Sequence, residues 1–190
     1  MNKNKRRVGL ILVIVGALLL GQNIIGKTLF HLQSSNEVNA FLQENTIDKD
    51  QLNIDAYKNI NIGDKIGIVE IPEISVKHVI VEGTENEQIK KHIGHFENTA
   101  MPGENGNFVI VGHNTNLYNE IFKDLNEIKI GQEIIIQSLS GIFKYKIVEK
   151  KVIEPTDFTV LNQDVANKEM TIITCTEGGE KRLSVKAELI

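Results

Sequence analysis

Short runs of apolar residues, separated by Gly, Asn and Pro, dominate the chain after residue 63. Several runs alternate apolar and polar side chains, and their lengths are typical of β-strands. Many short strands at this spacing predict a mainly β domain over 61–190, either a sandwich or a barrel. Two less regular segments, 85–92 and 117–125, are expected to form short helices. The expected strands are 66–71, 76–81, 108–111, 133–137, 142–148, 170–175 and 182–189.

The beginning of the chain has a different pattern, basic and then apolar. Four basic residues within 1–7 precede the stretch 8–26, which is apolar except at Gln22 and Asn23. About 17–25 residues suffice to cross the hydrocarbon core, and basic residues favour the cytoplasmic side. The sequence therefore predicts a cytoplasmic tail over 1–7, a single membrane-spanning helix over 8–26 and an extracytoplasmic remainder. A cleaved signal peptide is the alternative, although no small-x-small cleavage site follows the apolar run.

Residues 27–60 link the apolar stretch to the β domain. This segment is polar, with apolar residues spaced as on one face of a helix. We expect one or two amphipathic helices here, forming a polar stalk. The spaced apolar residues are Leu29, Leu32, Val38, Phe41 and Leu42.

Composition narrows the possible functions. The formal net charge of −4, with no basic stripe, excludes a nucleic-acid partner. The single cysteine excludes an internal disulfide, and a lone cysteine is by default a small buried hydrophobe. Outside the cytoplasm, where thiols tend to be oxidised, a single unpaired cysteine is conspicuous.

The last two expected strands place this cysteine, Cys175, beside a cation. Leu183 and the apolar residues at every second position after it predict that Arg182 faces outward from a half-buried strand. Met170 and Ile172 are expected in the core, which puts Cys175 on the opposite face. A tight turn at 178–179 (Gly-Gly) would pair Cys175 with Arg182 across the hairpin. A thiol beside a fixed cation on an outer face is not a buried structural cysteine.

A nucleophilic thiol also needs a base. The chain has five histidines, and two of them, His95 and His113, each follow a glycine. His113 comes directly after the apolar run 108–111, at a strand end of the kind that lines active sites, and we favour it over His95. A purely structural role for His113 stays open on spacing alone.

Several motifs resemble the sortase family of cysteine transpeptidases. The segment 171–175 (Thr-Ile-Ile-Thr-Cys) resembles the family signature T-L-x-T-C, with Ile172 in the usual Leu position. Arg182 stands seven residues on, where the family has its arginine, and 107–113 resembles the strand that carries the family's histidine. The resemblance spans about 63–190. It extends to 67–72, 94–96, 101–107, 154–157 and 160–161.

The resemblance implies a closed eight-stranded β-barrel of a membrane-anchored enzyme on a Gram-positive cell surface. It implies Cys175 as nucleophile, His113 as general acid and base, and Arg182 as stabiliser of the oxyanion or substrate. The implied substrate is an LPxTG-like sorting signal, cut between Thr and Gly through a thioester. The acceptor would be an amine of a peptidoglycan precursor or cross-bridge. The run 101–107 favours class D, and other housekeeping-type classes remain open.

Further positions follow by analogy with the family. The backbone N–H of Thr176 would assist Arg182 at the oxyanion. No cofactor and no required metal are expected. A core-packing role is the alternative for the four aliphatic residues of the expected substrate groove. The residues of this groove are Val111, Val160, Leu161, Ile173 and Thr174.

Two other functions compete with transpeptidation. A membrane-tethered β-barrel binding module would carry an inert Cys175. A hydrolytic cysteine peptidase would use the same three residues and pass the acyl group to water.

Overall fold

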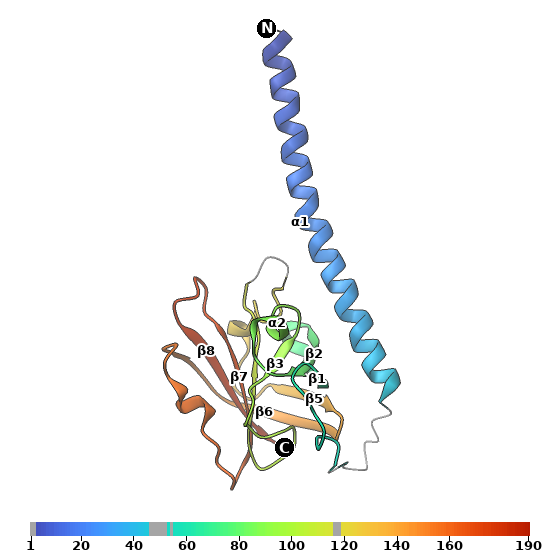
Figure 1. The fold of residues 1–190 in the computed structure, drawn as a ribbon. Helices are drawn as coiled ribbons and strands as arrows, with labels where there is room; N and C mark the ends of the chain where they lie inside the picture. The colour runs from blue at the N-terminus through green and yellow to red at the C-terminus, as the bar shows by residue number, and fades with distance from the viewer. Residues whose placement is uncertain (1–2, 46–52, 54, 116–118) are drawn as a thin grey trace.

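Eight β-strands close into a barrel in the computed structural model, which describes residues 3–45, 53, 55–115 and 119–190 (Figure 1). The strand order around the barrel is β1-β2-β3-β4-β7-β8-β6-β5. The β2–β3 and β4–β7 pairs are parallel, and the other pairs are antiparallel. The predicted closed eight-stranded barrel is confirmed. The strands are β1 (Lys65–Ile71), β2 (Val76–Glu82), β3 (Ile93–His95), β4 (Gly106–Val111), β5 (Glu133–Ser138), β6 (Gly141–Ile153), β7 (Lys168–Cys175) and β8 (Arg182–Leu189).

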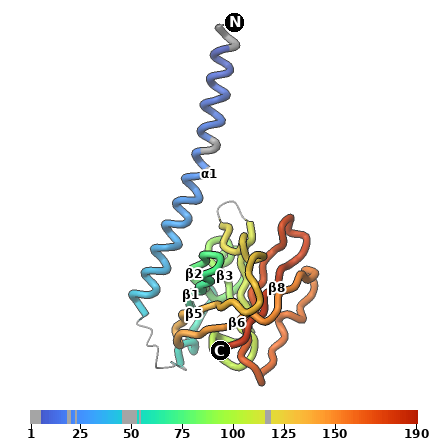
Figure 2. Tube along the Cα trace, turned by 180° about the vertical axis from the view of Figure 1, so that it is seen from behind, coloured from blue at the N-terminus to red at the C-terminus, as the bar shows by residue number. Residues whose placement is uncertain are grey.

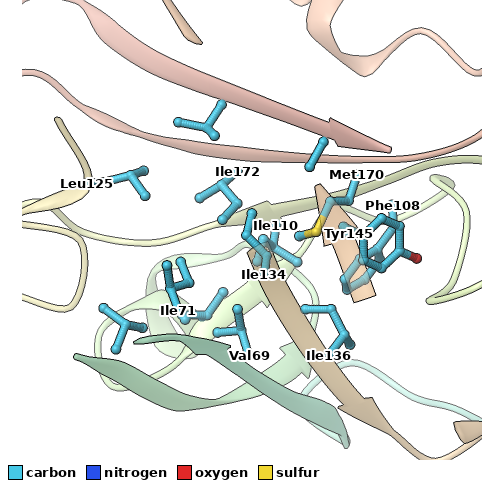
Figure 3. Packing of buried hydrophobic residues seen from close by; sticks show 14 of the residues in the cluster. Val69, Ile71, Phe108, Ile110, Leu125, Ile134, Ile136, Tyr145, Met170 and Ile172 are labelled. Atoms are coloured by element: carbon cyan, nitrogen blue, oxygen red, sulfur yellow. The ribbon is translucent and has the colours of Figure 1, made fainter. Parts of the chain in front are cut away.

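Alternation of apolar residues along the strands fills the barrel interior (Figure 3). Met170 and Ile172 of β7 point into this core, as predicted from their spacing. Leu183 and Val185 of β8 do the same, so the other face of both strands is left for Cys175 and Arg182. Full burial of one such aliphatic side chain contributes about 1.5–3 kcal/mol. The core therefore fixes which face each strand presents.

The helices within the domain are shorter than the sequence pattern predicted. The segment expected at 85–92 is a single turn, α2 (Asn86–Ile89). The helix expected over 117–125 is wrong for its described part, 119–125, which holds turns and the first residue of the 3-10 helix η2 (Leu125–Glu127). Two further 3-10 helices are η1 (Pro72–Ile74) and η3 (Phe158–Leu161).

A single long helix, α1 (Lys3–Glu44), precedes the barrel. Its first half extends away from the barrel, and its second half lies along the barrel wall (Figures 1 and 2). Val38 and Phe41 pack there against an outer apolar patch of β1 and β2 that includes Ile68 and Val79. The helix is continuous across residues 26 and 27, and its last turns are docked on the barrel.

In the described part of the chain, no helix is both long enough and apolar enough to cross a bilayer. The predicted spanning segment 8–26 is therefore not supported by the structure.

Aromatic rings and an ion pair extend the contact between α1 and the barrel. Phe30 of α1 stacks on His78 of β2, with ring centroids 6.0 Å apart. His92 lies edge-on to His78 at 6.2 Å, and its Nε2 is 2.6 Å from Oε2 of Glu37. His78 is only 5% exposed, and this burial lowers its pKa to about 4. His78 is therefore neutral at physiological pH.

Candidate active site

Strands β4, β7 and β8 lie side by side and carry the three residues expected to act together. Residues of β4 pair with β7 in parallel, ending with Val111 opposite Ile173. Gly112 N–H still donates to the Ile173 carbonyl at 3.2 Å, so the register continues beyond β4. His113 follows Gly112, so it is two residues past Val111 of β4, just as Cys175 is two residues past Ile173 of β7. Neighbouring strands are about 4.8 Å apart, which is within reach of a side chain.

The β7–β8 hairpin places Arg182 on the other side of the cysteine. Cys175 pairs with Arg182, as the position of the turn predicted. Gly178 and Gly179 both have positive φ, 83° and 78°, where glycine avoids the strain of a Cβ atom. Cys175, at the end of β7, therefore lies between Arg182 of β8 and the end of β4, which His113 follows by two residues.

The thiol of Cys175 is free and partly exposed, rather than sealed in the core. This placement departs from the default of a buried structural cysteine. A peptide can approach such a thiol without unfolding of the barrel.

The guanidinium of Arg182 is held at the turn. Its Nη1 donates to the carbonyls of Gly179 and Lys181, both at 3.1 Å. An arginine has five N–H donors, so the donors on Nε and Nη2 are not used by these two bonds. The turn thus orients the guanidinium and leaves capacity to bind an oxyanion.

The imidazole of His113 is half-buried, and this burial lowers its pKa. Its Nε2 has no hydrogen-bond partner in the described part of the chain. The backbone is fixed by Phe122 N–H, which donates to the His113 carbonyl at 3.0 Å. A neutral imidazole with an unpaired nitrogen can accept a proton.

The alternative histidine, His95, lies elsewhere and is committed to other contacts. It is 1% exposed, and its Nδ1 is 2.6 Å from Oε2 of Glu82. Its ring stacks on Phe108 at 5.2 Å. His95 is a structural histidine of the β2–β3–β4 wall.

The expected groove residues fall into two groups. Val111 and Ile173 oppose each other on the face that carries Cys175. Val160 and Leu161 lie on η3, and Asn107 Nδ2 holds this helix against the start of β4 by donating to the Val160 carbonyl at 2.8 Å. Val111 and Ile173 thus lie at the ends of β4 and β7, whereas the helix that carries Val160 and Leu161 lies at the start of β4.

Thr174 and Thr176 do not lie as expected. Thr174 is 1% exposed, and its hydroxyl donates to the Gly112 carbonyl at 2.8 Å, because alternation turns it away from the face of Cys175. The N–H of Thr176 donates to the Lys181 carbonyl at 3.0 Å. That N–H is therefore already used in the hairpin and does not point freely at an oxyanion.

One contact at this site was not predicted from the sequence. Asn114 donates from Nδ2 to the backbone carbonyl of Cys175 at 2.8 Å. The only signal in the sequence is its place directly after His113. Among the described residues, no group of three or more His, Cys, Asp or Glu side chains is arranged to hold a metal ion.

Comparison with known proteins agrees with this geometry. The sortase-domain family model matches residues 69–190, a stretch that contains all three residues. The chain belongs to the sortase family. Members of this family are cysteine transpeptidases.

Relatives of this sortase include class D proteins. Sortase D of Bacillus subtilis (strain 168) is 31% identical over 113 residues, which cover 60% of this chain and 55% of the relative. The chain thus spans about half the length of that protein. The structure of a Clostridium perfringens sortase D5 transpeptidase matches with a TM-score of 0.66 and 48% identity, over 70% of this chain and 83% of that one.

A third match concerns a sortase of another class. The structure of Clostridium perfringens sortase C with the C-terminal cell wall sorting motif has a TM-score of 0.66 and 31% identity, covering 82% of this chain and 84% of that one. The resemblance to the sortase family is therefore confirmed, class D proteins are among the relatives, and the fold is shared with sortases of other classes.

Proposed function

We propose that this sortase cleaves an LPxTG-like sorting signal between Thr and Gly and transfers the acyl group to an amine of the cell wall. The observation that supports this proposal is the strand register, which pairs Cys175 with Arg182 and sets the end of β4, just before His113, beside β7. The similarity to a sortase C whose structure includes a C-terminal cell wall sorting motif supports the substrate class.

The reaction begins with proton transfer from the Cys175 thiol to Nε2 of His113, which has no hydrogen-bond partner among the described residues. The thiolate attacks the Thr carbonyl carbon, and the carbonyl oxygen becomes an oxyanion. Donors of Arg182 stabilise the oxyanion, and its fixed position avoids a reorganisation cost.

The tetrahedral intermediate collapses when the C–N bond to Gly breaks. His113 gives its proton to the leaving amine, and the Thr carbonyl stays on Cys175 as a thioester. An incoming amine then loses its proton to His113 and attacks the thioester. A new amide bond forms as the C–S bond of the thioester breaks, and His113 returns its proton to the sulfur of Cys175.

The aliphatic side chains of Val111, Ile173, Val160 and Leu161 would contact the apolar residues of the signal. Val111 and Ile173 lie next to the reacting residues, and η3 lies further along the same strands. An extended peptide that runs along β4 and β7 could therefore contact η3 with its apolar residues and place its Thr-Gly bond at Cys175.

The test is incubation of the full chain with a library of sorting-signal peptides, followed by mass spectrometry of the intact protein. An acyl adduct on Cys175 that is absent from Cys175→Ala supports the proposal. No adduct with any peptide, together with an unreactive thiol, would favour a binding module with an inert cysteine.

An amine acceptor then separates transfer from hydrolysis. With an oligoglycine acceptor, we expect the free-acid product to be replaced by an amide. If the amine leaves the product unchanged, the protein is a hydrolytic peptidase with the same site.

Action at the outer face of the membrane belongs to the same proposal. Its support is the basic tail 1–7, the apolar stretch 8–26 and the exposure of apolar side chains such as Leu12 and Val13. Fractionation of cells expressing the full chain, or the chain without residues 1–26, tests it. Equal recovery of both in the soluble fraction would contradict membrane attachment.

A further inference from the structure

The hydrogen bonds between β4 and β7 do not stop where β4 ends. Beyond Val111, Gly112 is tied to β7 by two bonds, its N–H to the Ile173 carbonyl and its carbonyl to the Thr174 hydroxyl. Past His113, the Nδ2 of Asn114 donates to the Cys175 carbonyl at 2.8 Å. His113 is thus held between two residues that are both bonded to the strand of Cys175.

We propose that Asn114 is a positioning residue, whose side-chain amide fastens the loop carrying His113 to the backbone of Cys175. It acts through His113 and does not itself touch the substrate. This inference rests on the proposed function, because it assumes that His113 and Cys175 react together.

The reason lies in how a parallel pair of strands ends. Inside the ladder, backbone N–H and carbonyl groups hold the spacing of the strands. After Gly112 the chain leaves the ladder, and the Asn114 amide supplies a donor in place of a backbone N–H. Asn carries this donor without a charge that would compete with Arg182 or His113.

A small displacement of His113 has a large effect on rate. Proton transfer requires heavy atoms about 2.6–3.2 Å apart, and misplacement by about 1 Å can cost about 100-fold in rate. The same bond is one among many in a barrel of eight strands, so its loss changes global stability little. Asn114 should therefore affect turnover far more than folding.

Three substitutions separate positioning from a structural role. Asn114→Ala removes the donor, Asn114→Asp keeps the shape but cannot donate, and Asn114→Gln restores an amide one methylene further out. The matched control is Thr115→Ala, which truncates an exposed side chain of the same loop. Each full-length protein is assayed with a sorting-signal peptide and an amine acceptor, for kcat and KM across pH.

We expect Asn114→Ala to lower kcat about 10- to 100-fold while KM changes less than about twofold. Asn114→Asp should lower kcat as well and move the acid limb of the pH profile upward, because its carboxylate favours the protonated form of His113. Asn114→Gln should recover part of the kcat, and Thr115→Ala should match the wild type.

The inference is overturned if Asn114→Ala keeps wild-type kcat, or if its loss of activity follows only the fraction of unfolded protein. It is also overturned if Asn114→Asp leaves the acid limb in place. Failure of the proposed function looks different, because Cys175→Ala would then retain activity or the wild type would form no acyl adduct.

Discussion

His78 and His113 lie in two different regions of the molecule, and both are at least partly buried histidines with a lowered pKa. Burial lowers the pKa of both, and Nε2 of each has no hydrogen-bond partner in the part of the chain that is described. His78 lies beneath α1, against Phe30 and His92, whereas His113 lies half-buried beside Cys175. At His78, loss of hydration favours the neutral imidazole and costs stability at acid pH. At His113, the same effect keeps the imidazole neutral, as the proposed base must be.

The two regions are also held together by different forces. Apolar packing by Val38 and Phe41 docks α1, and polar side chains of the helix such as Lys27 and Glu37 also contact the barrel domain. Side-chain hydrogen bonds from Thr174 and Asn114 hold the loop of His113. Changes at the α1 contact should therefore appear mainly as stability, and changes at the site mainly as rate.

The largest effect is expected from His113→Ala. Loss of a general acid and base lowers kcat by about 10²–10⁴-fold. The measurement is peptide cleavage with an amine acceptor, and His78→Phe is the control for removal of a buried imidazole. A variant His113→Ala that retains more than about a tenth of wild-type kcat would contradict the role of His113.

Phe41→Ala tests the packing of α1. Truncation of a buried Phe costs about 3–5 kcal/mol, which is measured as a change in the free energy of unfolding in denaturant. Leu29→Ala on the same helix is the control, since Leu29 is 60% exposed and its truncation should change stability by less than about 0.5 kcal/mol. Equal effects of the two substitutions would show that α1 does not dock through Phe41.

The pH dependence of stability tests the burial of His78. Its pKa falls from 6.5 unfolded to about 4 folded, so the native state binds fewer protons between these values. The contribution of neutral His78 to the free energy of unfolding should be fully present above pH 6.5. It should fall by about 3 kcal/mol as the pH decreases to 4.

The pKa of a neighbouring carboxylate, Glu37, is also lowered. Burial raises the pKa of Glu37, but the hydrogen bonds from His92 and Gln33 and the charges of His92 and Lys65 outweigh it, and the pKa lies below 4.5. His78→Phe should therefore flatten the stability curve between pH 6.5 and 4.5. An unchanged slope in that variant would place the titrating group elsewhere.

The smallest effect is expected at the ion pair between Lys27 and Glu120. The two charged atoms are 2.8 Å apart, but the side chains are 45% and 28% exposed. Such a pair contributes less than about 1 kcal/mol, and salt screens it. Lys27→Ala should lower stability slightly at low salt and not at high salt, and a larger loss that persists in high salt would be unexpected.

Local patterns in the sequence predicted most of the barrel and part of the site. Alternation assigned Met170 and Ile172 to the core, and the glycine pair at 178–179 gave the register of Cys175 with Arg182. The same alternation places Thr174 on the core side, so its expected contact with substrate came from resemblance alone. Strand β3 has only three residues, too few to show an alternating pattern.

Long-range pairings were beyond the reach of these patterns. The parallel pairing of β4 with β7 depends on closure of the barrel across the β5–β6 hairpin. The spacing of Val38 and Phe41 indicated an apolar helix face but not the strands that cover it. The bond from Asn114 to Cys175 arises only once β4 and β7 are neighbours.

The separation of His113 from Cys175 along the chain has a consequence for the newly made protein. The two residues meet only across parallel strands, and the whole β5–β6 hairpin lies between them in the sequence. During synthesis His113 emerges from the ribosome before Cys175, and the two come together only when β4 and β7 pair. The proposed nucleophile therefore gains its proposed base only when the barrel is complete.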